Sequence, residues 1–239
     1  MEALIFAAGL GTRLGALGER TPKALLDVGG RTMLELAVHH LSTAGVRRVV
    51  VNVHHHGERI AEFVRNRDLG VEVELSWERD RPLETGGGLL HARDRFQGDG
   101  PIFLYNVDVL TDLDLTALRE AHERGGGPAT LAVQRRTSSR QLLLDEGGLF
   151  GRVDKGRGLR VEARAPRGRI RSRAFAGIHI VSRDFLQQIT ERGVFSILVP
   201  YLRLAGGGAF IQGVSVGGSY WLDVGTPERL REARAAFSS

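Results

Sequence analysis

The apolar residues follow two spacings that alternate along the chain. Short continuous apolar runs, as at residues 46–53, are typical of strands buried on both faces of a sheet. Residues 32–44 instead carry apolar side chains at helical intervals and are followed by Gly45, a residue type that commonly ends helices. By these signs we expect strands at residues 4–6, 46–53, 71–77, 101–107 and 129–134, and helices at 32–44, 56–67, 89–95 and 115–124.

This alternation predicts an α/β fold, Rossmann-like, with a mixed and mostly parallel sheet flanked by helices. After residue 133 the pattern changes: two apolar runs flank Glu146-Gly147-Gly148, which indicates a β-hairpin. Residues 156–173 are rich in arginine and glycine and lack periodicity, so we expect a mobile loop there. Further elements are expected as strands at 174–181 and 210–216 and helices at 185–190, 194–204 and 227–237.

We find no internal repeat and no linker in the sequence. The pattern therefore predicts a single domain over residues 1–239, with a small β-rich hairpin and loop insertion at 140–173.

The composition is that of an ordinary soluble globular protein, with 42% hydrophobic and 26% charged residues. The absence of cysteine excludes disulfides and thiolate metal sites. No segment approaches the ~20 consecutive apolar residues of a membrane span, and the N-terminus lacks the basic region of a secretory signal. We therefore expect a cytoplasmic protein that does not contact a membrane.

The formal net charge of +5 indicates an anionic partner. Nucleic acid is not expected, because the basic residues are dispersed and only 6% of the chain is aromatic. A small phosphorylated substrate explains the charge more simply. Lysine and arginine together number 33, yet Lys23 and Lys155 are the only lysines. A lysine near a loop that could bind a ligand is therefore unusual in this chain and indicates a specific role.

A glycine-rich loop, AAGLGTRL at residues 7–14, follows the first expected strand, and TPKA follows at 21–24. Such a loop allows backbone N–H groups to approach a phosphate closely. A P-loop would end in Gly-Lys-Ser/Thr, whereas this loop ends in Thr12-Arg13-Leu14. A dinucleotide-binding motif would need a third glycine where Leu14 stands, so a dehydrogenase is not expected either.

Six blocks that span nearly the whole chain resemble the signature of the sugar-1-phosphate nucleotidylyltransferases. The nearest branches are the N-acetylmuramate-1-phosphate uridylyltransferases and the mannose-1-phosphate guanylyltransferases. The blocks are AAGLGTRL at 7–14, TPKALLDVGG at 21–30, ETGGG at 84–88, Asn106-Val107-Asp108, AGI at 176–178 and WLDVGTPE at 221–228.

The resemblance implies the nucleotide-diphospho-sugar transferase fold and a Mg²⁺-dependent enzyme. The implied reaction transfers a nucleotidyl group from an NTP to a sugar 1-phosphate and releases pyrophosphate. The attacking phosphate oxygen is already anionic, so the reaction needs alignment and charge neutralisation rather than a strong general base. The chain carries the residues for that task and no nucleophile triad.

The resemblance also assigns roles to individual residues. It implies nucleotide binding by Ala8, Gly9, Gly11, Thr12, Arg13, Lys23, Gly86 and Gly87, catalytic roles for Arg13, Lys23 and Asp108, sugar binding by Asn106 and Gly177, and Mg²⁺ binding by Asp108 and Asp223.

Elementary chemistry agrees with three of these roles. The planar fork of Arg13 suits the departing phosphates, whereas the compact ammonium of Lys23 can lie between two phosphates. Asp108 ends an apolar strand, where ligands of open α/β sheets bind. A second carboxylate beside it would repel it unless a cation such as Mg²⁺ lay between them.

Two departures from the family pattern concern the sugar side. Val107 stands where a glycine is more common. The Glu-Lys-Pro motif of many relatives is replaced by Glu162-Ala163-Arg164-Ala165-Pro166, so that either Arg164 substitutes for the lysine or the contact is absent. The sequence leaves open whether the nucleotide is UTP or GTP, which sugar is used and the oligomeric state. A catalytically silent nucleotide-binding subunit is the alternative function, but Lys23 and both aspartates are present.

Overall fold

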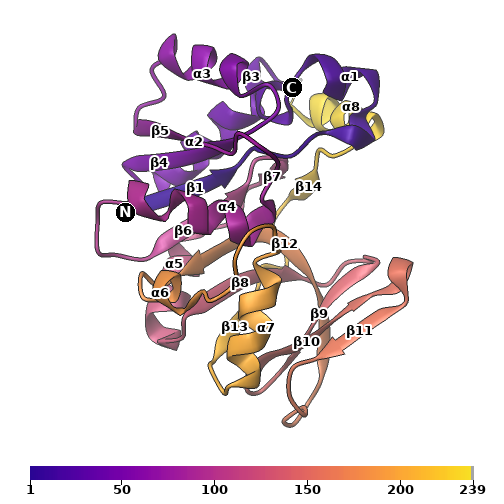
Figure 1. The fold of residues 1–239 in the computed structure, drawn as a ribbon. Helices are drawn as coiled ribbons and strands as arrows, with labels where there is room; N and C mark the ends of the chain where they lie inside the picture. The colour runs from indigo at the N-terminus through magenta and orange to yellow at the C-terminus, as the bar shows by residue number, and fades with distance from the viewer. Residues whose placement is uncertain (238–239) are drawn as a thin grey trace.

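Three parallel strands form the centre of the main sheet (Figure 1). In the computed structural model, which describes residues 1–237, β1 (Glu2–Phe6) lies between β4 (Arg48–Val53) and β6 (Ile102–Asn106). The edge strand β5 (Glu72–Trp77) pairs in parallel with β4. These strands follow the predicted apolar runs, and their carboxyl ends lie along one edge of the sheet.

The strand β12 (Arg171–Val181) makes the sheet mixed. It runs antiparallel to β6 and to β8 (Ala129–Gln134), and its first three residues pair instead with β9 (Arg140–Asp145). Its pairing register with β8 shifts between Phe175 and His179. On the far side of β8, β13 (Ile211–Ser215) adds a parallel strand. The predicted α/β class with a mixed, mostly parallel core is confirmed.

The expected hairpin is formed by β9 and β10 (Gly148–Asp154), which pair antiparallel. The expectation of a mobile loop over 156–173 is wrong for two parts of that segment, because β11 (Leu159–Glu162) pairs with β10 and β12 already begins at Arg171. β11 is only four residues long and is flanked by arginines and glycines. Such a short run does not show a clear alternation of apolar and polar residues. The edge of β10 provides the hydrogen bonds that order this strand.

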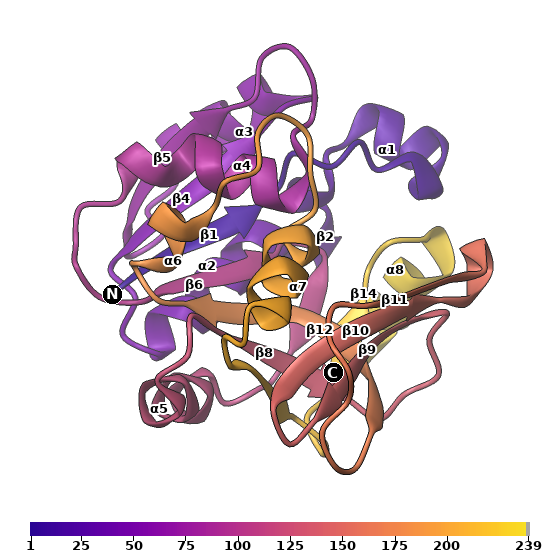
Figure 2. The same ribbon diagram turned by 60° about the horizontal axis from the view of Figure 1, so that its bottom comes forward.

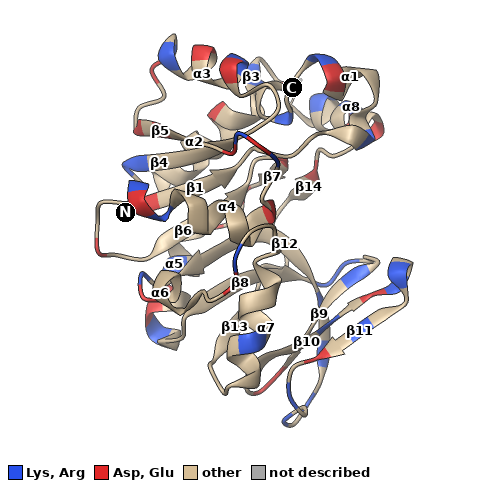
Figure 3. Ribbon diagram, in the orientation of Figure 1, with Lys and Arg blue, Asp and Glu red and all other residues tan. Residues whose placement is uncertain are grey.

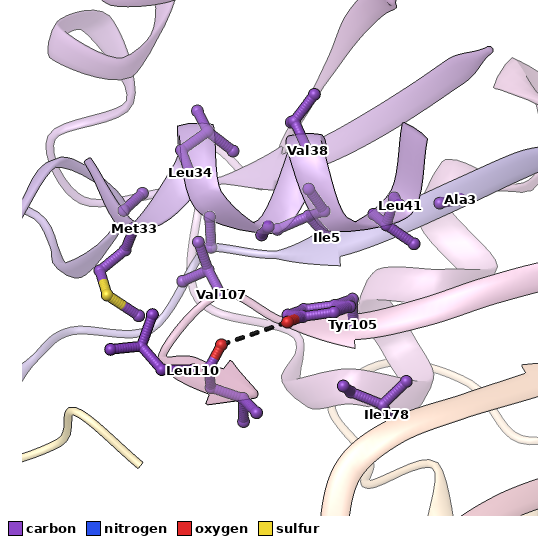
Figure 4. Close-up of a cluster of buried hydrophobic side chains, with 14 of the residues drawn as sticks. Ala3, Ile5, Met33, Leu34, Val38, Leu41, Tyr105, Val107, Leu110 and Ile178 are labelled. Carbon is purple, nitrogen blue, oxygen red and sulfur yellow. Dashed lines mark hydrogen bonds between the residues drawn. The ribbon is translucent and has the colours of Figure 1, made fainter. Parts of the chain in front are cut away.

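Apolar side chains alternate between the two faces of the central strands, and Figure 4 shows the cluster on one of these faces. Ala3 and Ile5 pack beneath α2 (Met33–Thr43), whereas Leu4 faces the opposite core with α4 (Glu84–Ala92) and α7 (Leu198–Gly206). Figure 2 shows α4 and α7 over one face of the sheet. Burial on both faces explains why the central strands read as continuous apolar runs.

The predicted helices are found with shifted ends. The helix expected at 194–204 begins only at Leu198, and the one expected at 185–190 ends at Gln188. None of the helices within residues 1–237 has the length and hydrophobicity of a membrane-spanning helix. The remaining elements are η1 (Thr12–Leu14), α1 (Ala16–Arg20), η2 (Lys23–Leu25), β2 (Asp27–Val28), β3 (Arg31–Thr32), α3 (Gly57–Arg65), η3 (Arg93–Arg95), β7 (Val109–Thr111), α5 (Leu115–Gly125), η4 (Lys155–Arg157), α6 (Phe185–Gln188), β14 (Trp221–Asp223) and α8 (Pro227–Ala236).

Candidate active site

A pocket of about 290 Å³ lies at the carboxyl ends of the central strands. Strand pairing places Asn52 of β4 and Asn106 of β6 in register with Phe6, so the three strands reach this edge together. Ligands of open α/β sheets bind at such an edge. The pocket is lined by Phe6, Ala7, Ala8, Gly9, Lys23, Asn52, Glu78, Pro82, Glu84, Thr85, Asn106, Val107 and Asp108.

A buried polar network fixes the start of the glycine loop. The Ala7 N–H donates to Asn52 Oδ1 at 2.7 Å, and Asn52 Nδ2 donates to Glu78 Oε1 at 2.6 Å. The other oxygen of Glu78 accepts from the Leu83 N–H at 2.7 Å. Burial raises the pKa of Glu78, and these two hydrogen bonds oppose that rise. The network ties the loop after β1 to the segment before α4.

Sequence reasoning missed Asn52 and Glu78. A polar residue near the end of an apolar strand was a usable signal for Asn52, since the same signal supported Asp108. Glu78 follows a strand whose pattern is mixed, and only the folded structure brings it to Asn52.

The glycine loop faces two hollows rather than one. Ala8 and Gly9 line the main pocket, whereas Gly11 and Thr12 line a second hollow of about 300 Å³ next to His55. Gly11 has a φ of 66°, a left-handed conformation that favours glycine. The predicted loop residues therefore lie together at the sheet edge, but on two sides of the loop.

Lys23 and Asp108 are brought together across 85 positions of sequence. Lys23 Nζ donates to Asp108 Oδ2 at 2.6 Å, and the two side chains are only 15% and 19% exposed. Both residues line the main pocket. The sequence predicted that Lys23 binds phosphates and that Asp108 binds Mg²⁺, and in the structure the two side chains lie side by side.

Asp223 lies on a strand adjacent to Asp108. β14 pairs antiparallel with β7, so that Asp223 is opposite Val109, and the Val224 N–H donates to the Asp108 carbonyl at 2.8 Å. Burial and the neighbouring Asp108 raise the pKa of Asp223, and nearby cations oppose the rise. Arg13 Nη2 lies 3.9 Å from Asp223 Oδ2.

These two carboxylates fit a divalent cation. Asp223 Oδ1 is buried and has no hydrogen-bond partner among residues 1–237, a state that is costly for a carboxylate oxygen. Within the same residues no group of three or more His, Asp or Glu side chains could hold a metal by itself. A hard cation held by two carboxylates therefore needs further oxygen atoms, such as those of phosphates, which is how Mg²⁺ is commonly bound.

Close packing also holds the Asp223 side of the site. A Cβ atom on Gly225 would lie 2.5 Å from Asp223 Oδ1 and 2.6 Å from Arg13 Nη2. Glycine at 225 therefore lets the carboxylate and the guanidinium approach the backbone.

Asn106 and Gly177, the predicted sugar-binding pair, are neighbours on β6 and β12. Gly177 has a φ of 80° at the irregularity in β12, and a Cβ there would lie 3.0 Å from Asn106 Nδ2. Next to Gly177, the Ala176 carbonyl accepts a hydrogen bond from Trp221 Nε1 at 2.7 Å. An indole is therefore fixed beside the predicted sugar position.

Gly86 and Gly87 have a structural explanation that the sequence did not suggest. Their N–H groups both donate to the Phe195 carbonyl, at 2.9 and 3.2 Å. A Cβ on Gly86 would collide with the Phe195 ring, and one on Gly87 with the Gly193 carbonyl. The pocket wall here consists of Glu84 and Thr85 instead, so a nucleotide contact with the two glycines stays a prediction.

Arg164 lies outside the pocket. Its guanidinium forms two hydrogen bonds of 2.7 Å to Asp145, whose side chain is fully buried. Figure 3 shows further basic residues along β9, β10 and β11. Because Arg164 is paired with Asp145 within this β-rich part, it does not replace the lysine of the Glu-Lys-Pro motif on the sugar side of the site.

The chain is similar to known nucleotidyltransferases along most of its length. A family model described as the MobA-like NTP transferase domain matches residues 3–172. The chain is 33% identical over 242 residues to the N-acetylmuramate alpha-1-phosphate uridylyltransferase of Caulobacter vibrioides, covering 99% of this chain and 96% of that protein. It is 29% identical to the probable mannose-1-phosphate guanylyltransferase 1 of Oryza sativa, covering 95% of this chain but only 62% of the plant protein.

Solved structures share the same fold at lower sequence identity. A putative glucose-1-phosphate thymidylyltransferase from Bacillus anthracis matches with a TM-score of 0.80 and 20% identity, over all of this chain and 96% of the other. HddC from Yersinia pseudotuberculosis, complexed with GMP-PN, matches with a TM-score of 0.76 and 20% identity over 99% of both chains.

Proposed function

This chain belongs to the sugar-1-phosphate nucleotidylyltransferases, enzymes that transfer a nucleotidyl group from an NTP to a sugar 1-phosphate, and we propose that the pocket at the carboxyl edge of β1 and β6 carries this reaction. The observation that supports the site most strongly is the meeting of Lys23, Asp108 and Asp223 beside the glycine loop. The three residues come from segments far apart in sequence and converge at a single edge of the sheet.

The reaction forms one bond and breaks another at the α-phosphorus of the NTP. A phosphate oxygen of the sugar 1-phosphate attacks, and the bond to the β-phosphate breaks, so pyrophosphate leaves. The protein must align the two anions and neutralise their charge. In the proposed assignment Lys23 lies between the α-phosphate and the sugar phosphate, and Arg13 holds the departing phosphates.

The glycine loop supplies backbone N–H groups to the nucleotide in this proposal. Ala8 and Gly9 face the main pocket, and Gly11 and Thr12 face the second hollow. Asp108 and Asp223 would hold Mg²⁺, because Asp223 Oδ1 has no hydrogen-bond partner from residues 1–237 and is available as a ligand. The cation supplies neutralisation of phosphate charge when it is bound.

We propose UTP and an N-acetylmuramate-type sugar 1-phosphate as the substrate pair. The uridylyltransferases of Caulobacter vibrioides and Neisseria meningitidis are 33% and 31% identical and match along nearly their whole lengths. The ETGGG block at 84–88 favours the same branch. GTP with mannose 1-phosphate is the second candidate, supported by the guanylyltransferases at 28–30% identity.

A substrate panel tests the proposal. Pyrophosphate release is measured with Mg²⁺ for UTP, GTP, CTP, ATP and dTTP, each against N-acetylmuramate, N-acetylglucosamine, glucose and mannose 1-phosphates. We expect the highest kcat/KM for UTP with N-acetylmuramate α-1-phosphate. A preference for GTP with mannose 1-phosphate would reverse the substrate assignment. Absence of release with every pair, under conditions in which the nucleotide binds, would support the silent-subunit alternative.

A further inference from the structure

Arg136 follows β8 and lies over the ring of Trp221. Its guanidinium carbon is 3.9 Å from the centre of that ring, and its Nη2 donates to the Phe175 carbonyl at 3.1 Å. Trp221 is fixed in turn by the bond from its Nε1 to the Ala176 carbonyl. The guanidinium is therefore held in one place against the irregularity of β12, with its face covered by the indole.

Arg136 keeps donors that the described residues leave unused. Its Nε is buried without a hydrogen-bond partner, and no carboxylate within residues 1–237 comes within the 4.0 Å of an ion pair. Burial lowers the pKa of Arg136, and Asp223 opposes that effect. A guanidinium whose face covers a ring still presents N–H groups in its own plane, which suits two oxygens of a phosphate.

Arg136 and Asp223 lie close enough to influence each other's charge, but they do not contact each other directly. Each side chain has a buried polar atom that finds no partner in the described part of the chain, Nε of Arg136 and Oδ1 of Asp223. The two groups interact electrostatically but do not form an ion pair. If Arg136 served only as the counterion of Asp223, a direct contact would satisfy both atoms. Both atoms are covered in the ligand-free protein, so a phosphate and its cation would supply their missing partners only with a local rearrangement of the side chains.

The position of Arg136 places it on the sugar side of the site. Trp221, which it covers, is bonded to Ala176, and the next residue, Gly177, packs against Asn106. Three other nearby cations already have carboxylate partners. Lys23 is bonded to Asp108, Arg13 lies near Asp223 with 61% of its side chain exposed, and Arg229 is paired with Glu232.

We propose that Arg136 binds the phosphate group of the sugar 1-phosphate, in the role for which Arg164 is not available. This inference rests on the proposed function, because it assigns one substrate of that reaction to a residue. It makes Arg136 a substrate-binding residue specific to the acceptor rather than to the nucleotide.

Kinetics of Arg136→Gln and Arg136→Lys test the proposal with the NTP and sugar 1-phosphate pair that the wild type uses best. We expect Arg136→Gln to raise the KM for the sugar 1-phosphate at least tenfold and to change the KM for the NTP less than twofold. Arg136→Lys keeps the charge but loses the planar fork, so its KM for the sugar 1-phosphate should lie between those of the wild type and Arg136→Gln. The control is Arg124→Gln on α5, an exposed arginine in an ion pair with Glu120, which should match the wild type.

Two kinetic outcomes would overturn the proposal. One is a KM for the sugar 1-phosphate within twofold of wild type in Arg136→Gln. The other is a matching rise in both KM values and in the Mg²⁺ requirement, which is the signature of a counterion to Asp223.

A binding measurement separates this proposal from failure of the proposed function. The NMR resonance of the Arg136 Nε–Hε group, assigned by its absence in Arg136→Lys, is followed as inorganic phosphate is added to the wild-type protein. We expect a saturable shift even if no substrate pair is turned over. A resonance that does not move at phosphate concentrations up to tens of millimolar would contradict phosphate binding at Arg136, whatever the kinetics show.

Discussion

Lys23 occupies a position in the pocket where arginine is not expected to replace lysine. Arginine supplies nearly all the basic residues of the chain, yet a lysine stands at the centre of the site. Its ammonium lies 2.6 Å from Asp108 in a pocket whose volume is about 290 Å³. A compact charge can exchange this carboxylate for phosphate oxygens with little movement, whereas a guanidinium needs more room.

We therefore expect Lys23→Arg to fold normally and to lose at least two decades of kcat, or about 3 kcal/mol of transition-state stabilisation. The matched control is Lys155→Arg, a change at the exposed second lysine. Steady-state pyrophosphate release for both variants makes the comparison. Near-wild-type turnover in Lys23→Arg would show that the shape of the cation is unimportant.

Gly9 and Gly86 are predicted to need glycine for different reasons. A Cβ on Gly9 would meet no atom of residues 1–237 within 4 Å, although Gly9 lines the pocket, whereas a Cβ on Gly86 would collide with Phe195. Gly9→Ala should thus leave the melting temperature unchanged and raise the KM for the NTP about tenfold, since the methyl group would occupy ligand space. Gly86→Ala should lower stability by roughly 1–3 kcal/mol through overpacking.

The control for this pair is Gly100→Ala, because a Cβ there also meets nothing within 4 Å and the residue lies outside the pocket. Thermal unfolding and NTP kinetics on the three variants give both readouts. An unchanged KM in Gly9→Ala would mean that the nucleotide does not approach this part of the loop.

At the scale of elements, a buried ion pair between Arg164 and Asp145 lies in the β-rich part formed by β9, β10 and β11. Asp145 accepts two hydrogen bonds from Arg164 and two from the N–H groups of Gly147 and Arg167. The Arg164 guanidinium, with these backbone donors, lowers the pKa of Asp145 from 3.8 to about 2 against the opposing effect of burial. The carboxylate thereby joins β9 to the segment that leads into β12.

This lowered pKa predicts a particular dependence of stability on pH. Since the folded-state pKa is below the unfolded value, the carboxylate stabilises the fold above about pH 4, by about 2 kcal/mol, and this contribution disappears as the pH falls towards 2. Asp145→Asn should lower the free energy of unfolding at pH 7 by about 2–3 kcal/mol and flatten its decline between pH 4 and 2.

Urea unfolding of Asp145→Asn at several pH values checks this prediction. Glu162→Gln is the control, because Glu162 and its partner Arg160 are 38% and 57% exposed and exposed ion pairs contribute little. If the two variants lost equal stability, the buried pair would not be the anchor of this part of the fold.

The sequence predicted the strands and most helices of the central sheet, because burial on both faces leaves apolar runs that can be read directly. The same reading failed at β11, a four-residue edge strand whose order comes from the edge of β10. Motifs located Lys23, Asp108 and Asp223. They could not locate Glu78 or Arg136, since neither residue stands in a motif, and only folding brings them to Asn52 and Trp221.

At the scale of the whole molecule, the fold brings two aspartates together that are far apart in sequence. β7 and β14 pair so that Asp223 is opposite Val109, and the Asp108 carbonyl accepts from the Val224 N–H. The ligand-free protein therefore holds two carboxylates close together, with a raised pKa at Asp223 and one oxygen unsatisfied. Lys23, Arg13 and Arg136 offset part of the repulsion from Asp108, and a bound cation would relieve the rest.

The decisive measurement is a double-mutant cycle of Asp108→Asn and Asp223→Asn, with pyrophosphate release followed as a function of Mg²⁺ concentration. If both carboxylates hold one cation, each single variant should lose at least a hundredfold in kcat/KM and require more Mg²⁺. The double variant should then be little worse than either single one, because residues that act as a unit are not additive. Losses that simply multiply, with an unchanged Mg²⁺ requirement, would contradict a shared metal at this site.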